Sequence, residues 1–182
     1  VPPAFPAQLL MLDGEAYWNP AVVPAGRVLV IGSGQTGCQL AEELNDAGRE
    51  VFLSCGRAPW MPRRLGGRDA VTWLSETTWF EAPLSSLPSP MARLGGNVQF
   101  SGRDGGHDLN YRVLSAMGVR LLGHLTSVEG KRAHFAADLN ESVAFGDARW
   151  ADMCKLLRDQ LPGKGHVVPE LPVPPPCRED PP

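Results

Sequence analysis

The sequence of 182 residues lacks the cysteine and histidine patterns that mark many small domains. Its four cysteines form no CxxC pair, which argues against a zinc ribbon and a thioredoxin-like redox motif. Its four histidines show no ligand spacing such as HxxxH, so we expect no metal site. Scattered free thiols are typical of a reducing compartment, and we therefore expect a cytoplasmic protein.

A large charge of one sign and long apolar runs are also missing. The net charge of -3 gives no general field that would attract nucleic acid or an anionic membrane. No segment approaches the roughly 18 consecutive apolar residues that a membrane span needs. The start of the chain has no basic flank before its short apolar run, unlike a signal peptide. We expect neither a nucleic-acid partner nor a membrane.

Proline divides the chain into three parts. Residues 1–24 form a proline-rich arm, which we expect to lie on the surface of another part of the protein. Residues 162–182 form a proline-rich tail, in which prolines occupy eight of the last 21 positions, and we predict a polyproline-like linker there. Between them, residues 25–161 have the length of a single domain with its own core.

The stretch "RVLVIGSGQTGCQLAEELNDAGREVFLSCGR", residues 27–57, has the pattern of one βαβ unit. The apolar run at 28–31 predicts a strand buried on both faces, as in a parallel sheet. The apolar period then changes and predicts an amphipathic helix over 35–47, followed by a second strand over 50–54. We therefore predict an α/β fold: a Rossmann-type parallel sheet with flanking helices in three layers, plus a β-hairpin.

The later segments fit this fold more loosely. Asp69 predicts the cap of a short helix over 70–77, and Asp108 the cap of a second helix that ends at Gly118. Residues 119–136 predict a strand followed by a hairpin partner, and a last helix is expected over about 138–161. The stretch 81–108 holds too many glycines and prolines for a long regular element, and its role and that of His107 stay open.

Three glycines after the first strand satisfy the pattern GxGxxG, and each has a mechanical role. Gly32 allows the tight turn, Gly34 lets a pyrophosphate approach the backbone, and Gly37 lets the helix pack closely. Gln35 and Thr36 stand at the helix N-terminus, where free N–H groups and the helix dipole favour an anion. This context predicts a dinucleotide site, whereas a glycine turn that has lost its ligand is the simpler alternative.

The end of the second strand indicates which dinucleotide is bound. FAD and NAD sites usually place an acidic residue there to accept hydrogen bonds from the ribose, but this position falls near Ser54. A hydroxyl at Ser54 and a guanidinium at Arg57 suit a 2′-phosphate, so NADP(H) is favoured. Arg63 and Arg64 could add to this phosphate site or form a solvated basic loop.

The stretch "AYWNPAVVPAGRVLVIGSGQTGCQLAEELNDAGREVFLSCGRAPWMPRR", residues 16–64, resembles the NADPH-binding domain of flavin-containing monooxygenase-like flavoproteins, which include bacterial FAD-dependent oxidoreductases. In such enzymes an NADPH domain is inserted into an FAD domain, and NADPH reduces the flavin. The resemblance implies that Ser54 and Arg57 hold the 2′-phosphate. It assigns the pyrophosphate to the glycine loop, namely Gly32, Ser33, Gly34, Gln35 and Thr36.

The sequence departs from this family in two ways. Asp13-Gly14 stands where family members usually carry a His-Ser pair ahead of the tyrosine that corresponds to Tyr17, and the second departure is more serious. No second glycine fingerprint precedes residue 27, and nothing after Leu161 resembles a returning FAD half. We therefore expect an NADP(H)-binding domain derived from an NADPH-dependent flavoprotein oxidoreductase, with FAD only on a missing domain or partner chain. Such a chain would have no catalytic residue of its own and would be inert alone. The alternative is a free-standing NADP(H)-binding or sensing module that acts through a partner.

Overall fold

The computed structural model describes residues 5–81, 83–87, 89, 92 and 96–177. The predicted long loop at 81–108 therefore lies partly outside the described residues. Where the structure describes it, it contains two single-turn helices, η3 (Leu84–Ser86) and η5 (Arg103–Gly105), and no longer element. This agrees with the many glycines and prolines of that stretch.

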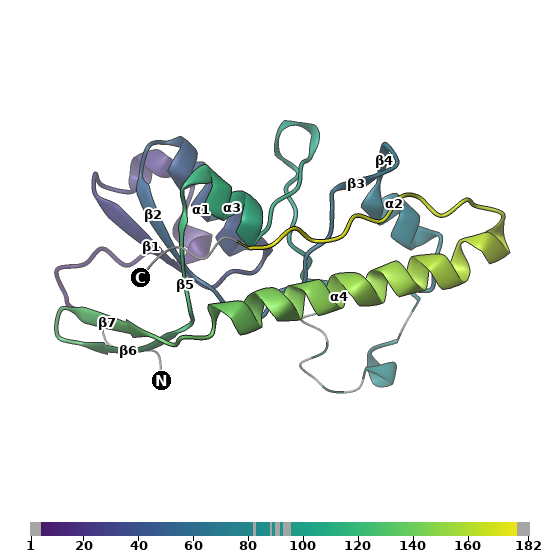
Figure 1. The fold of residues 1–182 in the computed structure, drawn as a ribbon. Coiled ribbons are helices and arrows are strands. Elements are labelled where there is room, and N and C mark those ends of the chain that lie inside the picture. Colours follow the sequence, from purple (N-terminus) through teal and green to yellow (C-terminus); the bar gives the residue numbers. More distant parts are fainter. Residues whose placement is uncertain (1–4, 82, 88, 90–91, 93–95, 178–182) are drawn as a thin grey trace.

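A three-stranded parallel sheet forms the centre of the half of the molecule that carries the glycine loop (Figure 1). Its strands are β1 (Arg27–Ile31), β2 (Glu50–Ser54) and β5 (Arg120–Leu122), in the order β1-β2-β5. The first two strands pair in register from Arg27 beside Glu50 to Ile31 beside Ser54. The predicted strands at 28–31 and 50–54 are thus confirmed, and Glu50 lies at the edge of the sheet opposite the glycine loop.

Two helices cover one face of this sheet. They are α1 (Gln35–Asp46), which connects β1 to β2, and α3 (Tyr111–Met117), which precedes β5 and packs against α1. Right-handed crossovers between neighbouring parallel strands place both helices on the same face, so they supply one helical layer. The apolar residues buried there form the sheet cluster, which includes Val30, Ala41, Leu44, Val51, Leu53, Leu114 and Leu121.

A second apolar cluster lies along the long helix α4 (Leu139–Gln160). The segment that follows β2, the short strands β3 (Arg64–Leu65) and β4 (Arg68–Asp69), and the helix α2 (Ala70–Ser75) pack against it. The Asp69 side chain caps α2, as its position predicts, by accepting from the Val71 N–H at 2.9 Å. We call this group the α4 cluster; its buried members include Trp60, Met61, Leu65, Leu74, Trp150, Met153, Leu157 and Leu161.

The segment after α3 differs from its prediction as one strand. It is divided at Gly123 into β5, which joins the parallel sheet, and β6 (Leu125–Glu129), which pairs antiparallel with β7 (Arg132–Phe135). A side chain at Gly123 would overlap the carbonyl oxygen of Ala136, so the two segments cross closely at this point. The predicted β-hairpin is therefore present, but it is separate from the sheet.

The cap of α3 corrects another expectation. Asn110, not Asp108, accepts hydrogen bonds from the first turn, with its Oδ1 at 3.0 Å from the Arg112 N–H. The Asp108 carboxylate instead accepts from the Arg63 N–H at 2.6 Å. Both residue types cap helices, so sequence alone could not choose between positions two residues apart. Gly118 ends the helix in the left-handed conformation, as predicted.

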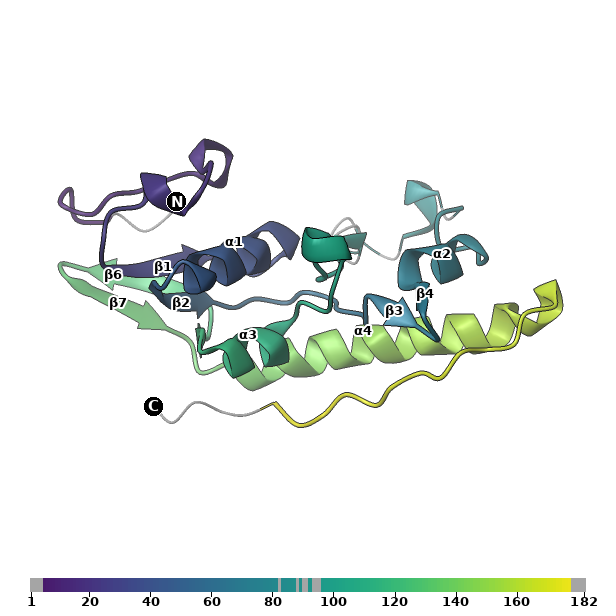
Figure 2. The same cartoon turned by 90° about the horizontal axis from the view of Figure 1, so that it is seen from above.

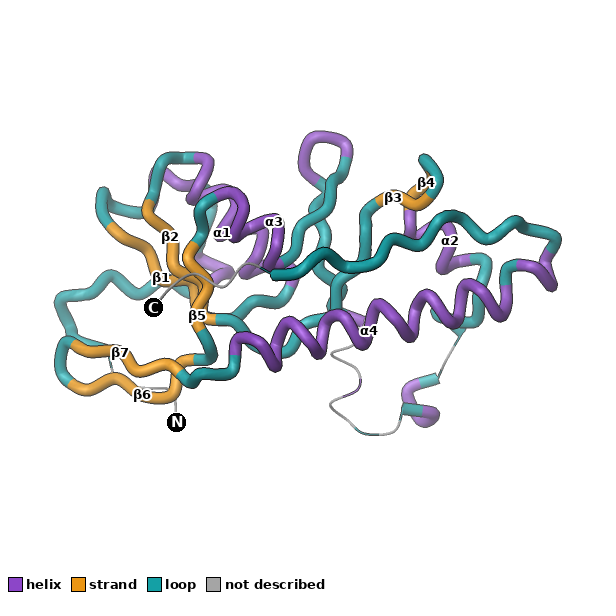
Figure 3. The backbone as a smooth tube through the Cα atoms, in the orientation of Figure 1, coloured by secondary structure: helices purple, strands orange, loops and turns teal. Residues whose placement is uncertain are grey.

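The arm and the tail contain little regular structure but contact the rest of the chain (Figures 2 and 3). The arm has two short turns, η1 (Gly14–Ala16) and η2 (Pro20–Val22). The tail follows η6 (Pro162–Lys164) and runs back beside α4, where the Pro172 carbonyl accepts from the Trp150 indole at 2.9 Å. Within the described ranges, every helix is too short or too polar to cross a membrane.

Candidate functional site

The glycine loop has the backbone geometry that its three glycines predict. Gly32 leaves β1 with a φ of 97°, which side chains other than that of glycine rarely permit. A Cβ at Gly37 would overlap the carbonyl oxygen of Gly32, so the first turn of α1 lies directly against the loop. The turn and the close packing therefore exist in this chain, and they hold the N-terminus of α1 at the end of β1.

The N-terminus of α1 carries free backbone donors. Gly34 is its N-cap and has no side chain to satisfy them, and the first hydrogen bond of the helix runs from Cys38 N–H to the Gly34 carbonyl at 3.0 Å. The preceding N–H groups of Gln35, Thr36 and Gly37 have no partner within the helix, since a helix leaves its first donors unpaired. Together with the helix dipole, these donors suit a pyrophosphate.

Asn97 is the side chain that lies nearest to this cradle. Its Nδ2 is 2.6 Å from the position that a Cβ at Gly34 would take. An exposed amide group therefore covers the space that glycine leaves over the loop. A bound phosphate would contact this amide or displace it.

Ser33 and Ser54 point inward, away from solvent, with 3% of each residue exposed. The Ser33 hydroxyl accepts from the Gly56 N–H at 2.8 Å. The Ser54 hydroxyl donates to the Gly123 carbonyl at 3.1 Å and accepts from the Leu125 N–H at 2.9 Å. These two serines hold the loops at the carboxyl edge of the sheet together, and the Ser54 hydroxyl already has both a donor and an acceptor.

Arg57 follows this edge and faces solvent. Its side chain is 70% exposed, and its nearest acidic partner is the Glu141 carboxylate at 3.8 Å, which is itself exposed. A surface ion pair at this distance holds a side chain only weakly. The Arg57 guanidinium is therefore able to turn toward an anion at the end of β2.

Arg63 and Arg64 do not join Arg57. The Arg63 guanidinium pairs with Asp69 at 2.7 Å and lies over the Phe100 ring at 5.0 Å from its centroid. Arg64 donates to the Gly105 carbonyl at 2.6 Å. Figure 1 shows the strand β3, which begins at Arg64, well apart from the parallel sheet.

Two buried thiols lie beneath the glycine loop. Cys38 Sγ donates to the Ser33 carbonyl at 3.4 Å, and Cys55 follows β2. Burial raises the pKa of Cys38 far above its ordinary value and that of Cys55 to about 12. Both thiols are therefore neutral at ordinary pH and carry no negative charge that would oppose an anion at the loop.

A cavity of about 630 Å³ opens beside the loop and follows the outer edge of β1. One wall consists of the arm, including Leu9 to Leu12 and Tyr17, and the other of β1 and α1. Gly32, Gly34, Thr36, Gly37 and Asn97 line it near the loop. The lining is otherwise largely apolar, so the cavity suits a flat ring system better than a second phosphate.

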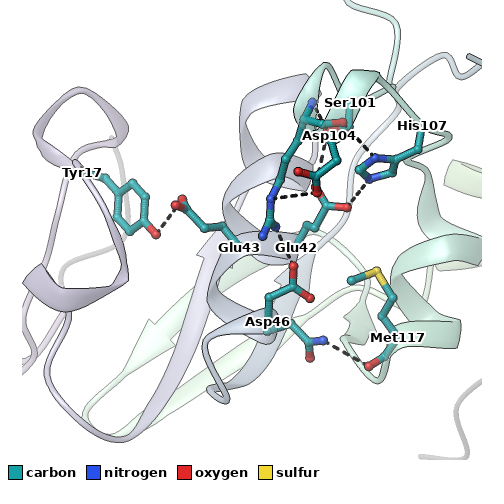
Figure 4. A network of polar contacts seen from close by, with 10 residues as sticks. Tyr17, Glu42, Glu43, Asp46, Ser101, Asp104, His107 and Met117 are labelled. Atoms are coloured by element: carbon teal, nitrogen blue, oxygen red, sulfur yellow. Dashed lines mark hydrogen bonds and ion pairs between the residues drawn. The ribbon is translucent and has the colours of Figure 1, made fainter.

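A polar network fixes α1 from two sides (Figure 4). On the arm side, the Tyr17 hydroxyl donates to Glu43 at 3.0 Å. On the other side, the nearly buried Glu42 carboxylate lies 2.5 Å from His107, and Arg103 pairs with Asp46 at 2.5 Å. The network attaches the loop at 101–107 to α1. It thereby also holds the preceding segment, which carries Asn97, near α1.

Sequence reasoning missed three residues that contact the glycine loop. Tyr111 and Gln99 bind Ser33 from below, and Asn97 covers Gly34. The tyrosine is one of only two in the chain, which is the single signal that could have drawn attention to it. Asn97 and Gln99 belong to the stretch 81–108, which has no periodic pattern.

The parallel sheet, with a glycine loop at the N-terminus of α1, gives this part of the chain an α/β, Rossmann-like fold. Residues 4–89, just under half of the chain, match the family model described as flavin-binding monooxygenase-like, so this part of the chain is similar to that family. The match contains β1, α1, β2 and α2 and ends before α3.

Individual relatives agree with this family. The chain is 40% identical over 55 residues to flavin-containing monooxygenase 5 of Oryctolagus cuniculus, which covers 30% of the chain and 10% of the relative. It is 38% identical over 61 residues to an uncharacterized CzcO-like oxidoreductase of Geobacillus kaustophilus, which covers 33% of the chain and 17% of the relative. It is 27% identical over 103 residues to the uncharacterized oxidoreductase CzcO of Bacillus subtilis, which covers 56% of the chain and 28% of the relative.

The matched region is therefore about a tenth of the length of the rabbit and rat monooxygenases. No solved structure matches the chain. The comparisons thus support the flavoprotein family but leave the cofactor of this segment to be argued from its residues.

Proposed function

We propose that this chain binds NADP(H) at its glycine loop and is the pyridine-nucleotide part of an FAD-dependent, monooxygenase-like oxidoreductase. One observation carries the proposal: the unpaired N–H groups that follow Gly34 and the exposed guanidinium of Arg57 both lie at the carboxyl edge of β1 and β2. The flavin-binding monooxygenase-like match of residues 4–89 supports it.

The pyrophosphate would lie over Gly34, where the absence of a Cβ permits close approach. The N–H groups of Gln35, Thr36 and Gly37 would donate to its oxygens, and the positive end of the helix dipole would stabilise its charge. Because the carboxyl end of β2 lies on one side of the loop and the cavity on the other, the adenosine half would extend toward Arg57. The nicotinamide half would then extend toward the cavity along β1.

The choice of NADP(H) over NAD(H) rests on the end of β2. An NAD site needs a carboxylate there for the ribose hydroxyls, and the nearest acid of that strand, Glu50, lies at its opposite end beside Arg27. Arg57 offers a fork of N–H donors that suits a 2′-phosphate. In this proposal the charge comes from Arg57, while Ser54 holds the neighbouring loop through Gly123 and Leu125.

The hydride acceptor in this proposal is FAD, which when bound takes a hydride from NADPH and passes the electrons onward. None of the residues described here is assigned to FAD, and we propose that a separate domain or chain supplies it. The sheet supports such a neighbour, since Ile31 on the face away from α1 is 50% exposed and Leu29 and Phe52 on that face are only partly buried. The alternative is a free-standing NADP(H)-binding module that acts through a partner.

Isothermal titration of the purified chain with NADP and with NAD tests the cofactor. We expect NADP to bind about tenfold more tightly or better, since a charge-assisted hydrogen bond to phosphate contributes roughly 1.5–3 kcal/mol. The Arg57→Ala variant should remove most of this preference. Arg64→Ala is the matched control, because Arg64 donates to Gly105 and should leave both affinities unchanged. Equal affinities for NADP and NAD in the unmodified chain would exclude the 2′-phosphate site.

A second measurement separates the flavoprotein part from a self-sufficient enzyme. We expect a colourless preparation that does not oxidise NADPH above background, with or without added FAD. A yellow preparation with flavin absorbance would show that the chain holds FAD itself and would contradict the proposed division of cofactors.

A further inference from the structure

A closed ring of three hydrogen bonds lies beneath the glycine loop. The Gly56 N–H donates to Ser33 Oγ at 2.8 Å, and the Tyr111 hydroxyl donates to the Gly56 carbonyl at 2.5 Å. Ser33 Oγ and Tyr111 Oη are 2.5 Å apart. Because the single hydrogen of the phenol goes to the Gly56 carbonyl, the Ser33 hydroxyl must donate to the phenol oxygen. The direction of every hydrogen bond around the ring is therefore fixed.

The ring is shielded from water. Ser33 is 3% exposed and Tyr111 is 4% exposed. A buried hydroxyl that loses its partner is costly, so breaking one hydrogen bond of the ring weakens the arrangement of all three groups. Burial also raises the pKa of Tyr111 far above its ordinary value, which keeps the phenol protonated and able to donate.

The three members of the ring belong to three different parts of the site. Ser33 lies within the glycine loop, Gly56 directly precedes Arg57, and Tyr111 is the first residue of α3. The Ser33 carbonyl is held from another side, where Gln99 Nε2 donates to it at 2.6 Å. The ring thus joins the backbone that would hold the pyrophosphate to the backbone that carries the arginine.

We propose that Tyr111 is a positioning residue that sets the distance between the glycine loop and Arg57 and thereby the preference for NADP(H) over NAD(H). This inference rests on the proposed function. Among the described residues, Glu141 is the one acidic partner of Arg57, at 3.8 Å, and it holds the exposed side chain only weakly. The backbone at Gly56 therefore decides where the Arg57 side chain begins and which space its guanidinium can reach. A ligand with a 2′-phosphate uses both ends of this connection, whereas NAD uses only the glycine loop.

The test is titration of the Tyr111→Phe variant with NADP and with NAD. We expect the Kd of NADP to rise about tenfold and that of NAD to change less than about twofold, which corresponds to the loss of one buried hydrogen-bond connection. Thr77→Val is the matched control: it removes another buried hydroxyl, which donates to the Leu74 carbonyl at 2.6 Å after α2 and lines neither the glycine loop nor the cavity. That variant should keep both affinities.

Ser33→Ala breaks the same ring of hydrogen bonds at its member in the glycine loop. It should reduce the preference for NADP over NAD as much as Tyr111→Phe does. The double variant with Tyr111→Phe should lose little more than either single variant, because the two changes break the same ring. An additive loss in the double variant would overturn the inference, since it would show that the two hydroxyls act separately.

The outcomes separate this inference from the proposed function. If the unmodified chain does not prefer NADP, the cofactor assignment fails and the inference fails with it. If the chain prefers NADP and Tyr111→Phe keeps that preference while its Tm falls, Tyr111 is only structural and the inference alone is overturned. If neither ring variant folds, amide exchange of the unmodified chain decides: NADP should slow exchange in residues 55–58 more than NAD does, and equal slowing overturns the inference.

Discussion

The two apolar clusters of this molecule are built in different ways. The sheet cluster comes mainly from β1, α1, β2, α3 and β5, most of which are short elements with a clear apolar period, and the first turns of α4 add Val143. The α4 cluster joins one face of α4 to side chains from irregular segments and from the tail, such as Trp60, Val98 and Leu171. The glycine loop packs against the sheet cluster. The part of the candidate site that has a recognisable sequence pattern is therefore supported by the core that also has one.

The two clusters nevertheless meet at one polar junction. Asp147 of α4 accepts from the Trp60 indole at 2.9 Å and pairs with both Nη atoms of Arg112 of α3, at 2.9 and 2.8 Å. Arg112 also donates to the Pro175 carbonyl of the tail. This junction adds to the connection that α4 itself makes, since Val143 of α4 belongs to the sheet cluster and Trp150 to the α4 cluster. We therefore expect the two halves to unfold together.

Truncation of one buried leucine in each cluster should have the largest effect. Leu157→Ala in the α4 cluster and Leu114→Ala in the sheet cluster should each lower the free energy of unfolding by about 4 kcal/mol, because both residues are almost fully buried. Urea unfolding followed by circular dichroism should show one shifted transition for each variant. Two transitions, of which Leu157→Ala moves only one, would show that the halves unfold independently.

Substitution of the third glycine should disturb the contact between the glycine loop and α1. Gly37→Ala places a Cβ against the Gly32 carbonyl, and we expect a loss of about 3 kcal/mol because backbone on both sides must move. Dinucleotide binding should disappear in the same variant. Gly14→Ala, at a position with open space and no positive φ, is the control and should change stability by less than about 0.5 kcal/mol. A stable Gly37→Ala variant would contradict the observed close packing.

The junction itself can be broken by Asp147→Asn. This change removes the charge that pairs with Arg112 and weakens the acceptor for Trp60, and we expect a loss of about 2 kcal/mol in thermal unfolding. Asp152→Asn removes an exposed partner of Arg149 on the same helix and should cost less than about 0.5 kcal/mol. Equal effects of the two variants would mean that the junction does not connect the clusters.

The smallest effect on stability is expected from a change in pH. The hydrogen bond to Glu42 raises the pKa of His107 above its ordinary value of 6.5. Because the pKa of His107 is raised in the folded state, its protonation stabilises the protein below pH 6.5. This contribution is lost as the pH rises through the pKa of His107 in the folded protein. The Tm difference between the unmodified chain and His107→Gln should therefore shrink between about pH 6 and about pH 8. A Tm difference that grows as the pH rises would contradict the predicted direction. His134→Gln, whose partner Glu129 lies 3.8 Å away, is the control.

The regular half of the fold follows from local pattern. The strands at 27–31 and 50–54, the helix between them and the long C-terminal helix all agree with their predictions within one or two residues. Each depends on an apolar period or on a cap within a few positions. The prediction of Asp108 as the cap of α3 was wrong, and the division of the strand at Gly123 was not predicted. Both depend on contacts with distant residues: Arg63 binds Asp108, and Ala136 lies against Gly123.

The candidate site divides in the same way. The turn at Gly32, the bare cap at Gly34 and the close packing at Gly37 follow from spacing, and the structure has all three. The hydroxyl at the end of β2 and the three arginines that follow do not stay together. Ser54 points inward, Arg57 faces solvent, Arg63 pairs with Asp69 of β4, and Arg64 donates to the Gly105 carbonyl. Residues adjacent in sequence can point to opposite sides, so proximity along the chain did not indicate which of them share a site.

The sequence by itself determined that this chain has a βαβ unit with a GxGxxG loop, because strand, turn and helix each need only neighbouring residues. Only the tertiary structure decided what stabilises the loop. Tyr111 lies 78 positions from Ser33, and Asp147 lies 87 positions from Trp60. Contacts across such separations form when the elements pack, and no periodic pattern of residues specifies them.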